Sequence, residues 1–105
     1  MTASDIYTTI KKLDIPCVYS HFKDGNQPAP PYIAYIGAGQ NQFAADNIPY
    51  HRQNVFQVEF YFTAKDPSLE DSIEEQLITD GWWYEKSEDV YIEDERVFVI
   101  YYTVS

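Results

Sequence analysis

The chain has 105 residues, of which 45% are hydrophobic and 17% aromatic, and its 17 acidic residues outnumber its 7 basic ones for a net charge of −10. This length holds one hydrophobic core, and the apolar content argues against disorder, so we predict a single acidic domain over residues 1–105. The negative charge disfavours contact with a nucleic-acid backbone or an anionic membrane surface, because both attract Lys and Arg.

The N-terminal segment predicts a short helix followed by a short strand. The helix covers about residues 4–13, with Ser4 as its candidate N-cap. Pro16 ends it, because a residue before proline avoids the helical region, and residues 17–19 are predicted as a strand. The apolar face of the helix has positions spaced four and three apart, namely Ile6, Ile10 and Leu13.

Two strands with a long loop between them are predicted next. After a loop rich in proline, residues 32–36 are aromatic and β-branched, as in a strand. From Gly37 to Pro49 the pattern is lost, which predicts a long loop, and a loop of that length in a small domain is usually functional or mobile. Residues 53–62 then alternate as in a half-buried strand, with Phe56, Val58, Phe60 and Phe62 on one side.

The last part of the chain predicts a second helix and a hairpin. Asp66 is the candidate N-cap, Pro67 the first helical residue, and Gly81 the residue that ends the helix. Residues 82–86 and 96–104 are predicted to pair as antiparallel strands. The order α-β-β-β-α-β-β predicts an α+β fold, a small and mainly antiparallel sheet with both helices packed on one face.

The charge is unevenly distributed along the chain. Residues 1–65 hold five acidic and five basic residues and are neutral overall, whereas residues 66–105 hold 12 acidic residues with only Lys86 and Arg96. Any functional interpretation of the acidity therefore concerns the second helix and the final hairpin.

The residues give little support to an enzyme. Cys17 is the single cysteine, which excludes an intrachain disulfide, and its apolar neighbours predict a buried, inert thiol. His21 and His51 are 30 residues apart with no metal or catalytic motif around them, so we expect neither metal nor cofactor. The N-terminus lacks the pattern of a signal peptide and no stretch is apolar enough to span a membrane, so we expect folding in a cytoplasm.

Six segments of the sequence carry a resemblance to known proteins, namely Tyr19–Lys23, Pro31–Tyr35, Phe43–Asn47, Gln57–Tyr61, Lys65–Pro67 and Tyr84–Lys86. On these segments the chain resembles a family of small proteins from phages and prophages of Gram-positive bacteria, encoded with other tail-assembly proteins. The resemblance runs from about residue 15 to the end and implies a tail terminator or tail-completion protein. Such proteins form a ring, usually of six subunits, that caps the tail tube and joins it to the head.

The resemblance implies a non-enzymatic virion component made in the host cytoplasm, with itself, the tail tube protein and the head–tail connector as partners. A cyclic ring needs two different surfaces on each subunit. We expect the long loop to supply one of them, with the candidate residues Gln42, Phe43, Ala44, Asp46 and Tyr50. Acidic residues lining a channel would repel DNA and let it slide, and the candidates for that role are Glu70, Asp71, Glu74 and Glu75.

Two other hypotheses remain open at this point. The 12 acidic residues of the final segment could imitate DNA phosphates in a phage-encoded inhibitor of a host nucleic-acid-binding protein. A hydrolase is the third hypothesis. Ten tyrosines indicate either protein-contact surfaces or merely aromatic sheet faces, and Trp82 and Trp83 would be contact anchors if they were exposed.

Overall fold

A computed structural model describes residues 1–23, 26–43 and 51–105, with the backbone alone for 41–43 and 51–52. It confirms the α+β fold and adds one short strand to the expected order. The elements are α1 (Ala3–Lys11), β1 (Cys17–Tyr19), β2 (Tyr32–Phe43), β3 (His51–Phe62), α2 (Pro67–Thr79), β4 (Tyr84–Lys86), β5 (Val90–Ile92) and β6 (Val97–Val104).

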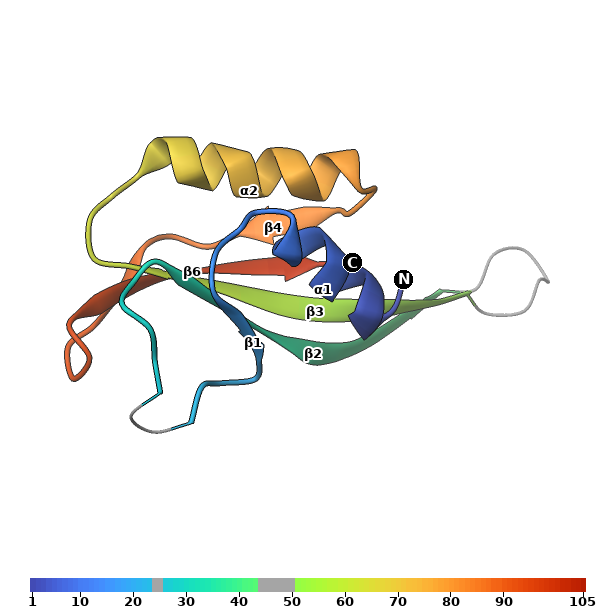
Figure 1. Cartoon of the computed structure of the whole chain (residues 1–105). Coiled ribbons are helices and arrows are strands. Elements are labelled where there is room, and N and C mark those ends of the chain that lie inside the picture. The colour runs from blue at the N-terminus through green and yellow to red at the C-terminus, as the bar shows by residue number, and fades with distance from the viewer. Residues whose placement is uncertain (24–25, 44–50) are drawn as a thin grey trace.

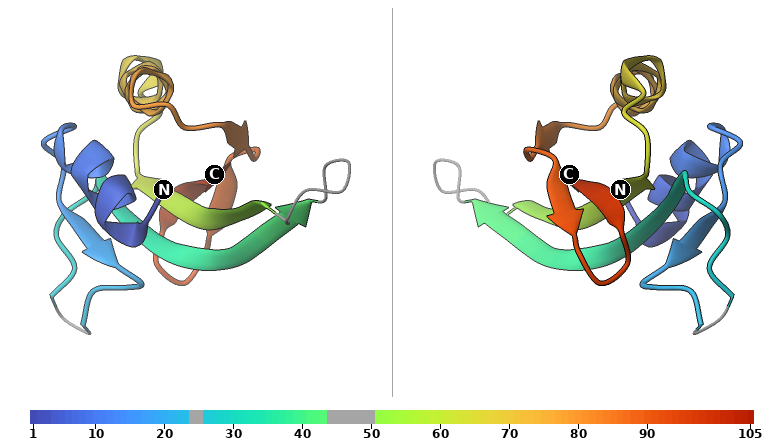
Figure 2. Two further views of the ribbon diagram at one scale, coloured as in Figure 1. Left: turned by 90° about the vertical axis from the view of Figure 1, so that its right-hand side faces the viewer. Right: turned by 90° about the vertical axis from the view of Figure 1, so that its left-hand side faces the viewer.

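The strands form one six-stranded sheet in the order β1-β2-β3-β6-β4. β1 runs parallel to β2, and the other pairs are antiparallel. β4 and β5 both pair with β6, β4 along residues 102–104 and β5 along residues 97–99. Both helices lie on the same face of the curved sheet, α1 toward β1 and α2 toward β4 (Figures 1 and 2).

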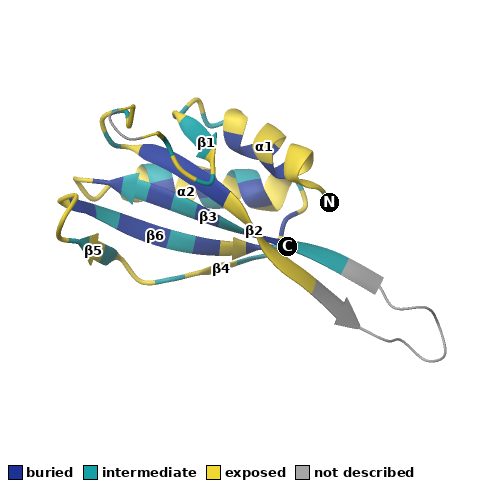
Figure 3. Ribbon diagram, turned by 90° about the horizontal axis from the view of Figure 1, so that it is seen from below, coloured by how far each residue is buried: buried dark blue, intermediate teal, exposed yellow. Residues whose placement is uncertain are grey.

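The core fills the space between the helices and the middle of the sheet. The alternation predicted for β3 is confirmed, because Phe56, Val58, Phe60 and Phe62 are all buried. Val55 is buried as well, although it lies on the opposite side of the strand. Figure 3 shows that burial follows the middle of β2, β3 and β6 and is lost toward the end of the β2–β3 hairpin. The fully buried core residues include Ile6, Ile10, Ile33, Val58, Phe60, Ile73, Leu77, Ile100, Tyr102 and Val104.

The N-cap of α1 differs from the prediction, whereas the ends of α2 agree with it. Thr2, not Ser4, caps α1: its hydroxyl accepts a hydrogen bond from the Asp5 backbone N–H at 3.3 Å. The Asp5 carboxylate in turn accepts from the Thr2 backbone N–H at 2.6 Å, which completes a capping box. Asp66 caps α2 by accepting from the Leu69 N–H at 3.2 Å, and Gly81 follows the helix with a φ of +87°.

The prediction of a long loop over residues 37–49 is wrong for residues 37–43, because β2 continues as far as Phe43. The ladder between β2 and β3 passes from the pair Gly37–Phe56 to the pair Gln40–Asn54, so β2 holds one extra residue there. Gly39 lies in this bulge with a φ of +95°. The two strands beyond the bulge form an arm, residues 40–43 and 51–54, which projects past the helices (Figure 1).

The predicted final hairpin is confirmed in its pairing, but its first strand begins at Tyr84 rather than at Trp82. Backbone hydrogen bonds between Trp83 and Ser105, both 3.0 Å, nevertheless extend the β4–β6 ladder by one pair. The segment between β4 and β5 stays on β6 through Ser87, whose N–H donates to the Tyr101 carbonyl and whose hydroxyl accepts from the Tyr101 N–H, both at 2.9 Å.

Candidate functional site

The four acidic residues proposed to face a channel divide into two pairs. Helical spacing places Glu70 and Glu74 on the side of α2 that packs on the sheet, whereas Asp71 and Glu75 are exposed. Glu70 is only 3% exposed, because it lies in the same buried stripe as Ile73 and Leu77. The expectation for Glu70 is therefore corrected: its carboxylate is not available to a channel surface.

Two lysines neutralise the buried carboxylate of Glu70. Lys65 Nζ lies 2.8 Å from Glu70 Oε2, and Lys86 Nζ lies 2.9 Å from Glu70 Oε1. Lys65 also contacts Asp89 at 3.0 Å, and Lys86 contacts Glu74 at 3.1 Å. Burial disfavours the charged form of Glu70, but the hydrogen bonds from the two lysines outweigh it and hold its pKa below the usual value. This cluster fastens α2 to β4 and to the segment before β5.

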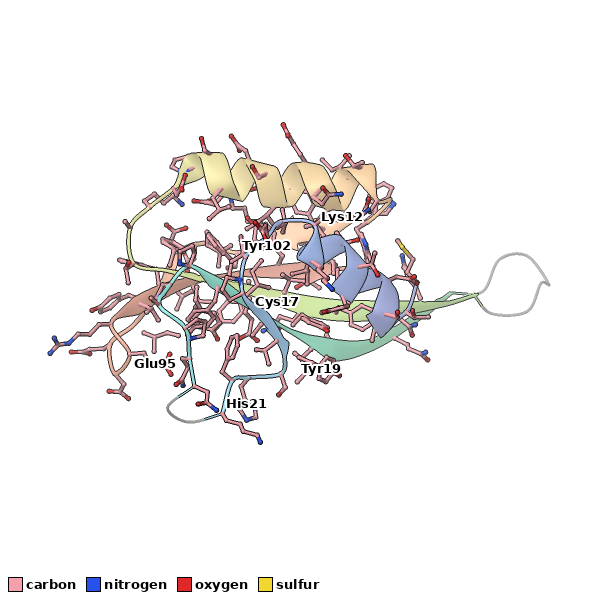
Figure 4. All side chains as sticks on the ribbon, viewed as in Figure 1. Lys12, Cys17, Tyr19, His21, Glu95 and Tyr102 are labelled. Carbon is pink, nitrogen blue, oxygen red and sulfur yellow. The ribbon has the colours of Figure 1, made fainter. Side chains whose placement is uncertain are left out.

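Glu74 extends the same cluster over the sheet. Its carboxylate accepts hydrogen bonds from the hydroxyls of Tyr84 and Tyr102, each at 3.1 Å. Figure 4 shows Tyr102 between the sheet and α2. Burial and the neighbouring carboxylate raise the pKa of Tyr84, which keeps its hydroxyl protonated as a donor. Two of the four helix acids are thus engaged within the fold, which leaves Asp71 and Glu75 on the outer side of α2.

The candidate interface residues of the predicted loop are placed only in part. Gln42 and Phe43 belong to β2, where they pair in register with Arg52 and His51 of β3. Ala44, Asp46 and Tyr50 lie outside the described residues. The described part of this segment is therefore a β-arm and not an irregular loop.

An open groove of about 520 Å³ lies at the base of the arm. Gln53 and Val55 of β3 form one wall, and Tyr84 and Glu85 of β4 form another. Trp83 borders the groove and is 79% exposed, the highest exposure of any large hydrophobic side chain in the described part of the chain. The sequence predicts Trp83 as a contact anchor only if its side chain is exposed, and in the structure it is exposed.

Trp82, its neighbour, is a core residue and not an anchor. Its side chain is 4% exposed and packs edge-on against Phe56, with the ring centroids 6.0 Å apart. The indole N–H donates to the Thr9 hydroxyl at 3.0 Å, which links the end of α2 to α1.

A cluster of tyrosines lies at the opposite edge of the sheet, beside α1 and β1. Tyr7 and Tyr19 are 40% and 51% exposed, and both rest on the buried ring of Tyr35, at centroid distances of 6.3 and 5.3 Å. Lys11 Nζ lies 5.6 Å from the centre of the Tyr7 ring. Sequence reasoning missed this cluster, since its members come from three different elements.

The remaining chemical candidates from the sequence are His21, His51 and Cys17. His21 is exposed, with its Nδ1 3.0 Å from the hydroxyl of the adjacent Ser20, and the side chain of His51 is outside the described residues. Cys17 is partly buried, which raises the pKa of its thiol. Within residues 1–23, 26–43 and 51–105, no group of three or more His, Cys, Asp or Glu side chains is arranged to hold a metal ion. Neither α1 nor α2, the helices of the described part, is long and apolar enough to cross a membrane.

No protein-family model matches the chain, and no curated protein matches it either.

Proposed function

We propose that the chain is a non-enzymatic structural protein of a phage tail, a terminator or tail-completion subunit that forms a ring at the junction of tail and head. The observation that supports the proposal best is the projecting arm of β2 and β3. An isolated two-stranded ribbon is only marginally stable in water, so an arm of this kind gains stability when another protein covers it. The resemblance to phage tail-completion proteins is the reason for proposing a ring at the end of a tail tube as the assembly.

The placement of exposed groups also supports a ring. The groove beside Trp83 and the tyrosine cluster lie on opposite sides of the sheet, next to its outer strands β4 and β1. A subunit in a ring needs two such different surfaces, one for each neighbour. Asp71 and Glu75, exposed on α2, are the acidic residues that we propose for the channel side.

The test is the oligomeric state of the purified chain. We expect light scattering and native mass spectrometry to detect closed rings at high protein concentration, or on addition of assembled tail tubes. The control replaces residues 41–53 with Asn-Gly, a two-residue turn between the paired positions Gln40 and Asn54, and should associate more weakly than the full chain because it lacks the arm. A full-length chain that remains monomeric at millimolar concentration and ignores tail tubes would contradict the proposal.

A further inference from the structure

We infer that the groove side of one copy receives the tyrosine side of the next, so that Trp83 packs on Tyr7 and Tyr19 of its neighbour. This inference rests on the proposed ring and names the two surfaces that would build it. The groove side comprises Gln53, Val55, Trp83, Tyr84 and Glu85, and the tyrosine side comprises Tyr7, Lys11, Tyr19 and Tyr35.

Trp83 has the properties of a preorganised anchor. Its backbone N–H donates to the Ser105 carbonyl and its carbonyl accepts from the Ser105 N–H, both at 3.0 Å, so the residue is held in the sheet while its indole stays 79% exposed. Tryptophan dominates the energetics of many protein interfaces, and an anchor that is already fixed loses little conformational entropy on binding. A side chain of this size therefore contributes favourable free energy when a partner covers it.

The tyrosine side offers exposed aromatic rings against which an indole can pack, with Tyr7 tilted by 36° and Tyr19 nearly perpendicular, at 82°, to the ring of Tyr35. The rings of Tyr7 and Tyr19 are both backed by Tyr35, which is only 7% exposed, so the surface is rigid from below. The Gly37 N–H donates to the Tyr19 hydroxyl at 3.4 Å and helps to orient that ring. Figure 4 shows Tyr19 at the end of β1, away from α2. Aromatic pairs add stability beyond the area that they bury.

The charges at the two sides are complementary. Glu85 borders the groove and is exposed, whereas Lys11 lies over the exposed Tyr7. A contact between groove and tyrosine sides therefore brings a carboxylate toward an ammonium group. A two-fold contact between two groove sides would instead bring Glu85 toward a second Glu85. Unlike charges favour the head-to-tail arrangement, and it repeats around a ring until the ring closes.

The experiment uses full-length chains with one engineered cysteine each, in a Cys17→Ser background. Glu85→Cys and Lys11→Cys place thiols on the two sides and leave Trp83 and the tyrosines intact. We expect oxidation to give cross-linked dimers when the two variants are mixed and little cross-linking in either alone. The chain with both cysteines should give a ladder of multimers.

A second variant measures the anchor. Trp83→Ala should weaken self-association at least tenfold in sedimentation equilibrium, whereas Tyr91→Ala, which removes another exposed aromatic ring on β5, should leave it unchanged. Efficient cross-linking of Glu85→Cys with itself would overturn the inference, as would equal effects of the two alanine variants. Rings that form without cross-linking in the mixture would refute this interface but not the ring, whereas the absence of any association would refute both.

Discussion

At the scale of single residues, the position of Glu70 on α2 decides the role of a charge that the sequence leaves open. Four acidic residues within six positions look equivalent in the sequence, but a helix turns them in different directions. Glu70 faces the sheet and meets Lys65 and Lys86, whereas Asp71 meets solvent. The same side-chain chemistry therefore serves the stability of the fold at one position and is available to a partner at the next.

Replacement of Glu70 with Gln should destabilise the protein by about 1–3 kcal/mol, measured by urea unfolding. The reason is that Lys86 and Lys65 lose a buried anionic partner, although the partial exposure of both lysines reduces the cost. Glu75→Gln, an exposed change on the same helix, should stay within about 0.5 kcal/mol of the original chain. Equal effects of the two variants would contradict this prediction.

Stability should fall as the pH drops below about 5. The pKa values of Glu70 and Asp80 are lowered in the folded state, Asp80 by hydrogen bonds from Thr9 and Lys12, so the unfolded chain binds protons first on acidification. The stabilisation is complete above the unfolded pKa values and is lost as the pH falls through the folded ones. Urea unfolding across pH 3–7 should show that the free energy of unfolding decreases less steeply with falling pH in Glu70→Gln than in the original chain. If the free energy of unfolding falls equally steeply in that variant, Glu70 is not a source of the pH dependence.

At the scale of elements, one polar junction holds α1 against the end of α2. Asp80 accepts from the Thr9 hydroxyl at 2.7 Å and from Lys12 at 3.0 Å, and the indole of Trp82 donates to the same Thr9 hydroxyl. Both elements are amphipathic and are predictable from their spacing. Their junction is not, because its residues lie about 70 positions apart in the chain.

Asp80→Ala should loosen α1 without unfolding the sheet. Thr9 and Lys12 lose their acceptor, so we expect faster amide hydrogen exchange in residues 3–11 and little change in β3 and β6, together with a loss of about 1–2 kcal/mol in global stability. Asp71→Ala, also on α2 but exposed, is the matched control. Uniformly faster exchange throughout the chain would show that the junction is not local.

At the scale of the whole molecule, the arm lies outside the core. The extents of 50 × 28 × 24 Å describe an elongated molecule, and the arm residues with described side chains, Gln40, Gln53 and Asn54, are not part of the core cluster. We therefore expect the rest of the molecule to supply most of the stability, and we propose the arm for contacts with other proteins.

The variant with residues 41–53 replaced by Asn-Gly should keep the Tm of the full chain within a few degrees, because the core cluster remains complete. Differential scanning calorimetry measures this, and the oligomeric state is measured on the same sample. A large drop in Tm would mean that the arm stabilises the body, and loss of assembly would then say nothing specific about contacts.

Much of the fold could be predicted from the sequence because the signals were local. The alternation of residues 53–62, the cap at Asp66 and Gly81, and the break at Pro16 each act within a few residues of the chain. The arm was missed because Gly37 and Gly39 interrupt the strand pattern, and a bulge there resembles a loop until the pairing partner is known.

The α+β class, the neutral and acidic halves, and the approximate positions of both helices and of the longer strands follow from the sequence alone, since these depend on periodicity and composition. The three-dimensional packing determines which charges remain on the surface, that Trp82 is buried while Trp83 is exposed, and that tyrosines from α1, β1 and β2 lie together. These outcomes depend on contacts between distant segments, which local pattern does not specify. The net charge of −10 is thus divided between carboxylates engaged within the fold, such as Glu70, and carboxylates such as Asp71 that remain free for partners.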